Sequence, residues 1–279
     1  MPRYLDLIDK CNYIDHAKGE HVPHYSFKAA VFDLDGVITK TAKVHSAAWK
    51  KAFDEYLRLR EQRDNEPFKE FTGQDYLAHV DGKPRYKGVQ NFLESRGIEL
   101  PFGDPGDPPD KETCCGIGNR KNDAFREILK IEPAEVYDST VERIKQLIEA
   151  GVKVAMASSS KNATLILQSL GMDSLFESMV DGIVSAQLGL KGKPEGDIFV
   201  TAAENVGGEP ASSIVFEDAT SGVAAGKNGG FGLVLGIARE DNIDELYANG
   251  ADKVVTDLQD APCEKLEEWF VEFSRKKQN

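Results

Sequence analysis

The chain has 279 residues, of which 41% are hydrophobic and 29% are charged, a composition typical of globular proteins and unlike that of disordered or fibrous chains. The 34 basic and 47 acidic residues give a net charge of −13, which opposes binding to nucleic acid or anionic lipid. No stretch approaches the ~18 consecutive apolar residues of a membrane span, and residues 1–6 lack the basic and then apolar pattern of a secretory signal. We therefore expect a cytoplasmic protein without a nucleic-acid or membrane partner, and we expect it to be a monomer.

The first core element is predicted at residues 29–32. Residues 1–27 show no sustained hydrophobic period, so we expect them to form an N-terminal extension. Residues 29–32 are an apolar run typical of a strand buried on both faces, and the polar sequence Asp33-Leu34-Asp35-Gly36 follows them directly. Apolar residues at helical spacing then predict a helix that leaves the core; they are Val44, Ala48, Trp49, Ala52, Phe53 and Leu57.

The middle of the chain differs in composition from its flanks. From about residue 59, charge-rich helical segments alternate with stretches rich in proline and glycine. Residues 101–109 are the clearest of these stretches, because their prolines can continue neither a helix nor a central strand. We expect an inserted, mainly helical domain over residues 46–135 and a core domain formed by residues 28–45 and 136–279.

Strand and helix candidates alternate again after residue 136. Apolar residues at helical spacing predict a helix that Gly151 ends. Further strands are predicted at 152–157, 214–216, 233–235 and 253–255, and helices around 162–170, 197–206, 221–228 and 264–277. This alternation predicts an α/β fold, a doubly wound parallel sheet with helices on both faces.

Polar side chains follow three predicted strands at the point where each strand ends. The first strand is followed by Asp33 and Asp35, the second by residues 158–162, and the third by Glu217 and Asp218. Ligands bind at the carboxyl ends of the strands in such sheets, so we expect these side chains to meet in one crevice. Converging carboxylates repel one another unless a cation neutralises them, and an all-oxygen site beside a phosphate suits Mg²⁺. An isolated pair of aspartates is more often a turn or a cap, so the prediction depends on the three clusters together.

The order of these groups resembles the four signature motifs of the haloacid dehalogenase (HAD) superfamily. Here the motifs are residues 33–39 (DLDGVIT), Ser158, Lys193-Pro194 and Glu217-Asp218. The resemblance spans residues 28–260, and the helical insertion after the first motif is similar to that of the β-phosphoglucomutase-like group. It implies a Rossmann-like core with an inserted helical cap domain. Finer matches to this group are Thr41, His45, Gly82-Lys83-Pro84-Arg85, Arg120-Lys121-Asn122 and Ser160-Lys161-Asn162.

The resemblance implies a role for each motif. Asp33 would be the nucleophile that forms an aspartyl phosphate, and Asp35 would be the general acid and base. Ser158 and Lys193 would bind the transferring phosphoryl group, where negative charge collects. The Mg²⁺ ligands would be Asp33, Asp35 through its backbone carbonyl, Glu217 and Asp218.

The resemblance also implies a second anion site. Arg85 would bind the non-reacting phosphate bidentately from the cap, assisted by Ser160 and Asn162. Lys121 and Lys161 would add positive charge around the transferring group, and His45 would hydrogen-bond near Asp35. Without the resemblance, Arg85 and Lys121 would equally be solvated surface residues. The remaining substrate-binding residues would be Thr41, Gly82, Lys83 and Ser159.

The implied activity is Mg²⁺-dependent interconversion of β-glucose 1-phosphate and glucose 6-phosphate through a bisphosphate. The alternative is a phosphatase of a small sugar phosphate, which would use the same Asp33 but pass the phosphoryl group to water. A carbon–halogen hydrolase would leave Asp35 unexplained, and a non-catalytic phosphosugar-binding regulator would not need both catalytic acids. Departures from the group are Lys40, where an acidic residue is common, and a longer cap at residues 62–81 and 101–109. These departures leave the sugar open.

Overall fold

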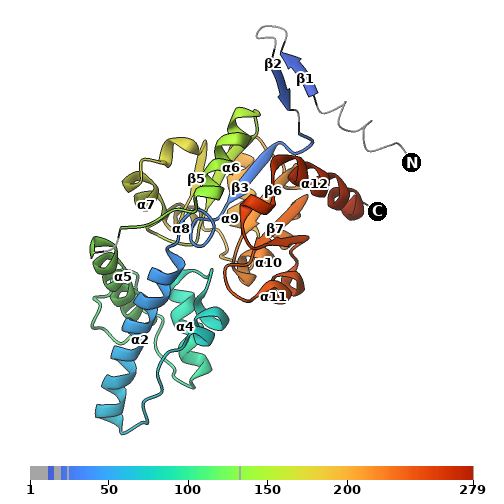
Figure 1. The fold of residues 1–279 in the computed structure, drawn as a ribbon. Coiled ribbons are helices and arrows are strands. Elements are labelled where there is room, and N and C mark those ends of the chain that lie inside the picture. Colours follow the sequence, from blue (N-terminus) through green and yellow to red (C-terminus); the bar gives the residue numbers. More distant parts are fainter. Residues whose placement is uncertain (1–11, 16–19, 24, 132, 279) are drawn as a thin grey trace.

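The computed structural model of the chain describes residues 12–15, 20–23, 25–131 and 133–278. Its core is a six-stranded sheet with the strand order β5-β4-β3-β6-β7-β8 (Figure 1). Every neighbouring pair of these strands is parallel, which confirms the predicted doubly wound α/β fold. The strands are β3 (Ala29–Phe32), β4 (Lys153–Ala157), β5 (Ser178–Val180), β6 (Ser213–Glu217), β7 (Leu233–Ile237) and β8 (Lys253–Val255).

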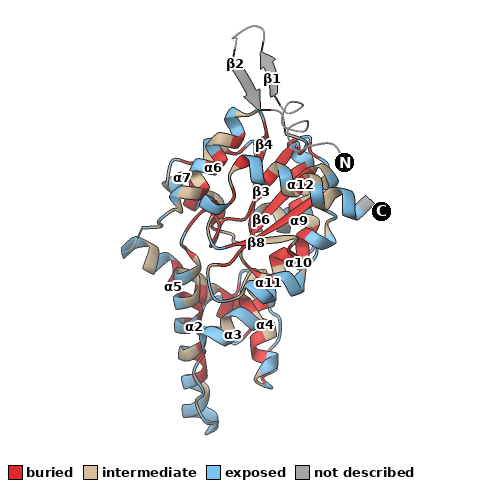
Figure 2. Ribbon diagram, turned by 45° about the vertical axis from the view of Figure 1, so that its right-hand side comes forward, coloured by how far each residue is buried: buried red, intermediate tan, exposed pale blue. Residues whose placement is uncertain are grey.

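Both faces of the sheet are covered because successive side chains of a strand point to opposite faces. Phe32 and Phe216 stack on one face with ring centroids 4.1 Å apart, and Val31 and Val215 lie on the other face. The first face packs against α6 (Asp138–Glu149), α7 (Ala163–Ser169) and α12 (Cys263–Gln278). The second packs against α9 (Asp197–Asn205), α10 (Thr220–Asn228) and α11 (Ile243–Asn249). Figure 2 shows the strands as the most buried part of the molecule.

Strand β5 is an element that the sequence pattern did not predict. It has only three residues, too few to show a period of two, and it forms by pairing with the edge of β4. Helix α8 (Gly182–Leu188) follows it. Three short 3₁₀ turns complete the core: η2 (Asp173–Leu175), η3 (Pro210–Ser212) and η4 (Leu258–Asp260).

The cap is a second, helical body with its own hydrophobic core (Figure 1). Its elements are α2 (Ala42–Asp64), α3 (Gly73–Asp75), the π-turn η1 (Tyr76–Val80), α4 (Arg85–Ser95) and α5 (Cys114–Ile131). The predicted stripe of α2 supplies this core, where Phe53 contacts the rings of Phe71 and Phe92. Helix α2 begins at Ala42 and therefore crosses the boundary that we placed at residue 46.

Two chain segments join the cap to the sheet, and they lie side by side. The amide of Lys40 donates to the carbonyl of Glu135 at 2.8 Å, and the amide of Tyr137 donates to that of Ile38 at 2.9 Å. This paired segment, the hinge, carries the chain out to the cap directly after Asp33 and Asp35, so the loop that follows β3 is continuous with the hinge.

The last residues of the expected N-terminal extension, residues 25–27, pack against the core domain. Strands β1 (Asn12–Asp15) and β2 (Glu20–Pro23) form an antiparallel pair outside the main sheet. Phe27 is buried in the core and stacks on Tyr25, while Ser26 hydrogen-bonds Glu267 of α12. The chain therefore joins the core before residue 28, because these aromatic rings gain burial against α12. No helix in the described part of the chain combines the length and the apolar character needed to cross a bilayer.

Candidate active site

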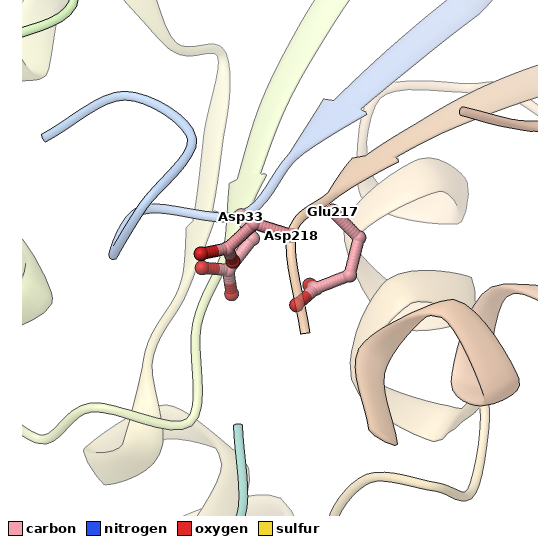
Figure 3. A group of neighbouring side chains, drawn as sticks. All are labelled: Asp33, Glu217 and Asp218. Carbon is pink, nitrogen blue, oxygen red and sulfur yellow. The ribbon is translucent and has the colours of Figure 1, made fainter. Parts of the chain in front are cut away.

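The predicted clusters meet at the carboxyl edge of the sheet. Asp33 follows β3, Glu217 ends β6, and Ser158 follows β4. The amide of Asp33 donates to the carbonyl of Phe216 at 3.0 Å, which continues the ladder to the strand ends and keeps the two acidic loops in register. Figure 3 shows the side chains of Asp33, Glu217 and Asp218 projecting beyond these ends. The shared edge follows from the parallel topology, as the sequence predicted.

Asp33, Glu217 and Asp218 form an acidic cluster in which one oxygen from each lies within 4.8 Å of the others. The ammonium group of Lys193 donates to Asp33 Oδ1 at 2.6 Å and to Glu217 Oε2 at 2.8 Å. Its side chain is only 1% exposed. The second oxygen of Glu217 accepts from the amide of Ala219 at 3.0 Å. One buried positive charge is thus shared by three carboxylates. Both oxygens of Glu217 accept hydrogen bonds, so the second oxygen of Asp33 and the oxygens of Asp218 are better placed to bind a cation.

The acidic cluster is suited to a divalent cation. Burial first, and then repulsion from Glu217, raises the pKa values of Asp33 and Asp218 well above the usual range of carboxyl groups. Hard oxygen donors with an excess of negative charge are the ligands that Mg²⁺ prefers. A bound cation would favour the ionised carboxylates.

Gly36 allows the catalytic loop to approach the acidic cluster. Its φ of +86° suits glycine, and a Cβ atom at this position would lie 1.7 Å from Asp218 Oδ2. The amide of Gly36 donates to the carbonyl of Thr39 at 2.7 Å and closes the turn. A side chain here would push the loop that carries Asp33 and Asp35 away from Asp218.

Asp35 lies in a different environment from the acidic cluster. Burial alone would raise its pKa, but His45 and the hydroxyl of Thr41 outweigh that effect and hold the pKa at about 2. Thr41 donates to Asp35 Oδ1 at 2.5 Å, and His45 Nε2 lies 3.2 Å from the same oxygen. Lys121 Nζ lies 2.6 Å from His45 Nδ1. Donation from this amine to Nδ1 requires the His45 tautomer with its proton on Nε2, which faces Asp35. These contacts fix the orientation of the Asp35 carboxylate.

A second polar group lies on the cap side of the crevice. Arg85 Nη2 donates to Asn122 Oδ1 at 2.8 Å, and Asn162 of the core donates to the same oxygen at 3.0 Å. Because the guanidinium group is bound to a neutral amide here, its positive charge is available to an anion. Arg85 therefore offers a cationic site separate from Lys193.

The cap is closed over the sheet edge. Ser159 donates to the carbonyl of Gly82 at 2.9 Å, and Ser221 donates to that of Asp81 at 3.0 Å. The enclosed crevice has about 60 Å³ of free space, well below the ~300 Å³ at the small end of ligand pockets. A ligand of that size therefore needs the cap or the lining side chains to move before it can enter.

The structure brings the predicted site residues together. Thr41 is fully buried behind Asp35; all the others line the one crevice, namely Asp33, Asp35, His45, Gly82, Lys83, Arg85, Lys121, Ser158, Ser159, Ser160, Lys161, Asn162, Lys193, Glu217 and Asp218. Lys161 differs from expectation in its position. Its ammonium group lies over the Tyr86 ring at 4.8 Å, beside Arg85, so its charge belongs to the cap side rather than to the transferring group.

Sequence reasoning did not assign five further lining residues to the site, namely Trp49, Tyr76, Val80, Asp81 and Ala219. Asp81 directly precedes Gly82, so the motif itself could have pointed to it. Burial raises the pKa of Asp81 to about 6, with repulsion from Glu217 adding to the effect. No local signal marks Trp49 or Tyr76, because both have the spacing of ordinary core residues.

Comparison with known proteins assigns the family. The family model described as haloacid dehalogenase-like hydrolase matches residues 27–230. The chain belongs to this family. It is an enzyme of the HAD superfamily, and the resemblance read from its motifs is confirmed.

Its relatives include mutases and phosphatases. A β-phosphoglucomutase of Mycobacterium bovis is 45% identical over 235 residues, covering 83% of this chain and 90% of that protein. A β-phosphoglucomutase of Bacillus subtilis is 33% identical over 244 residues, covering 87% and 95%. A fructose-1-phosphate phosphatase of Escherichia coli is 26% identical over 210 residues, covering 75% and 95%. Among solved structures, a β-phosphoglucomutase from Clostridium difficile matches in fold with a TM-score of 0.71 at 21% identity, covering 88% and 98%.

Proposed function

We propose that this enzyme is a Mg²⁺-dependent β-phosphoglucomutase, which interconverts β-glucose 1-phosphate and glucose 6-phosphate through an aspartyl phosphate and a bisphosphate. The observation that carries the proposal is the presence of two cationic sites in one closed crevice, Lys193 beside Asp33 and Arg85 on the cap. A sugar with two phosphates needs both sites. The M. bovis and B. subtilis mutases, which the chain covers over most of their length, support the same activity.

Asp33 would act as the nucleophile and Asp35 as the acid and base. Lys193 keeps one oxygen of Asp33 in place and leaves the other to attack phosphorus, while the phosphorus–oxygen bond to the sugar breaks. In the phosphorylated enzyme, the ionised Asp35 would first take the proton of the attacking sugar hydroxyl as the phosphoryl group leaves Asp33. When Asp33 then attacks the other phosphate of the bisphosphate, Asp35 would give this proton to the departing sugar oxygen.

Asp33, Asp218 and the backbone carbonyl of Asp35 would hold Mg²⁺, with Glu217 beside them. The cation would supply charge neutralisation between Asp33 and the phosphoryl oxygens. Glu217 would act mainly by fixing Lys193 and the start of α10, since both of its oxygens already have partners.

Arg85 would make the mutase reaction possible by holding the sugar through its second phosphate. The bisphosphate presents either phosphate to Asp33 if it turns end for end, and Arg85, with Asn162, binds the phosphate that is not reacting. Cap closure would bring Arg85 and Asn162 together and exclude water from the aspartyl phosphate. Recognition of the sugar and protection of the intermediate would then be one event.

A sugar-phosphate phosphatase is the second candidate. The E. coli relative favours it, and the same Asp33 would serve if water entered the closed crevice. The difference between the two activities is whether the aspartyl phosphate passes its phosphoryl group to a sugar hydroxyl or to water.

One assay separates the two candidates. Purified enzyme with Mg²⁺ is given β-glucose 1-phosphate and a small amount of glucose 1,6-bisphosphate, and glucose 6-phosphate and free phosphate are measured in the same samples. The mutase predicts glucose 6-phosphate in large excess over phosphate. Phosphate release without glucose 6-phosphate would establish the phosphatase instead, and the Asp33→Asn variant is the control that should lose either activity.

A further inference from the structure

Arg239 follows β7, far in sequence from both catalytic aspartates, yet it binds the catalytic loop. Its Nε donates to the carbonyl of Gly36 at 2.8 Å across 203 positions of sequence. Gly36 is the residue after Asp35, and its amide closes the turn on Thr39. Arg239 therefore holds the outer side of the turn that carries Asp35.

The same guanidinium group is anchored on the core and on the hinge. Its Nη1 donates to the carbonyl of Thr256 at 3.1 Å and to Asp257 Oδ2 at 3.1 Å. Its flat face lies over the ring of Tyr137, 3.5 Å from the centroid, and Tyr137 is bonded to Ile38 in the hinge. The side chain is 12% exposed. Three separate parts of the molecule thus meet on one rigid, planar group.

A second side chain of the same loop reaches the other acidic segment. Asn242 Nδ2 donates to the carbonyl of Asp218 at 3.4 Å. The loop after β7 therefore contacts the backbone of both segments that supply the site, Asp35–Gly36 through Arg239 and Asp218 through Asn242.

We propose that Arg239 is a positioning residue for phosphoryl transfer, which fixes the Asp35–Gly36 turn against the hinge so that Asp35 stays in place while the cap opens and closes. The proposal rests on the proposed function, because it assigns proton transfer to Asp35. Arg239 does not line the crevice around Asp33 and Asp35; it lines a neighbouring cavity that shares Tyr76, Asp81 and Asp218 with that crevice. Its loss should impair the chemical step rather than the binding of the sugar phosphate.

Arg143 provides a matched control. Its side chain is buried, and its Nη2 donates to the carbonyl of Leu258 at 3.2 Å, close to the segment that Arg239 binds. Its Nη1 donates to Gln146 of α6 and to Cys263 of α12, and neither of these contacts involves the Asp35–Gly36 turn. Replacement of either arginine by methionine removes a guanidinium group that donates to a backbone carbonyl of this segment, Thr256 for Arg239 and Leu258 for Arg143.

The experiment compares wild-type protein with Arg239→Met, Arg239→Lys and Arg143→Met, measuring kcat, KM and the thermal midpoint. We expect Arg239→Met to lower kcat by about 10- to 100-fold, as a misplacement of about 1 Å does, with KM changed by less than about 2-fold. Arg239→Lys, which keeps the charge but not the planar group, should recover part of kcat. Arg143→Met should lose thermal stability and keep kcat.

The outcomes are distinct. An unchanged kcat in Arg239→Met, or an equal loss of kcat in Arg143→Met, would show that Arg239 is only a structural residue. A rise in KM with constant kcat would place Arg239 in substrate binding and overturn the proposal as well. If wild-type protein turned over no sugar phosphate, the proposed function would fail first and this inference with it.

Discussion

Replacing Lys193 by methionine removes the positive charge from the acidic cluster with little change in side-chain length. Lys193 is 1% exposed and bonds two carboxylates, at 2.6 Å to Asp33 and 2.8 Å to Glu217. Its ammonium group also lies 4.6 Å from the centroid of the Phe199 ring, so the variant's thioether group would meet an aromatic neighbour. The difference in stability between wild type and Lys193→Met therefore reports mainly on the two ion pairs of Lys193.

The expected cost is large because two buried carboxylates lose their partner. Breaking a buried ion pair by removing one side costs about 3–5 kcal/mol, since the remaining charge stays desolvated. For a protein of this size the thermal midpoint should fall by roughly 10 °C. The repulsion that already raises the pKa of Asp33 would act without opposition from Lys193. The loss of stability should therefore be greater at pH 8 than at pH 5, where Asp33 can take up a proton.

Urea unfolding and thermal scans at both pH values, without added divalent cation, measure this effect. Lys153→Met is the matched control, because Lys153 binds Glu177 at 2.9 Å with both side chains 51% exposed. Such a surface pair contributes at most about 1 kcal/mol. If Lys193→Met and Lys153→Met unfolded at the same urea concentration, the argument that Lys193 holds the acidic cluster together would be refuted.

Other predictions concern the remaining parts of the site. The pKa of Asp81 is raised to about 6; a carboxyl group with a higher pKa in the folded state than in the unfolded one destabilises the fold as the pH rises from about 4 to 6. Urea unfolding across this range should thus show a flatter profile for Asp81→Asn than for wild type, and identical profiles would contradict the assignment. Arg85→Met should raise KM for glucose 1,6-bisphosphate by about 10- to 100-fold, because a charge-assisted bond contributes about 1.5–3 kcal/mol, while hydrolysis of acetyl phosphate stays unchanged; an equal effect on both compounds would argue against a second phosphate site. Thr41→Val removes a donor to ionised Asp35, so the acidic limb of the kcat profile should move to higher pH, and an unmoved limb would show that the hydroxyl does not act on Asp35. Chelation of divalent cations should abolish turnover and added Mg²⁺ should restore it, whereas full activity in excess chelator would exclude the metal site.

Much of the fold and the acidic edge could be predicted from the sequence. The apolar run before Asp33 and the alternation of strands with helices predict a parallel sheet, and the ends of parallel strands share one edge. The acids after β3 and β6 and the serine after β4 therefore had to converge, whatever the details of the loops. This inference works because it uses only periodicity and the geometry of the sheet.

The tertiary structure alone decided how the loops and the cap complete the site. Asp81 approaches the acidic cluster only because the cap closes. The ammonium group of Lys161 packs over the Tyr86 ring, and this contact places it beside Arg85. The bond from Arg239 to Gly36 joins residues 203 positions apart through a backbone carbonyl. A carbonyl group is the same for every residue type, so no pattern of side chains marks it as an acceptor. Hydrophobic periodicity specifies which face of an element is buried. Contacts between loops depend instead on how the cap and the core domain pack against each other in three dimensions.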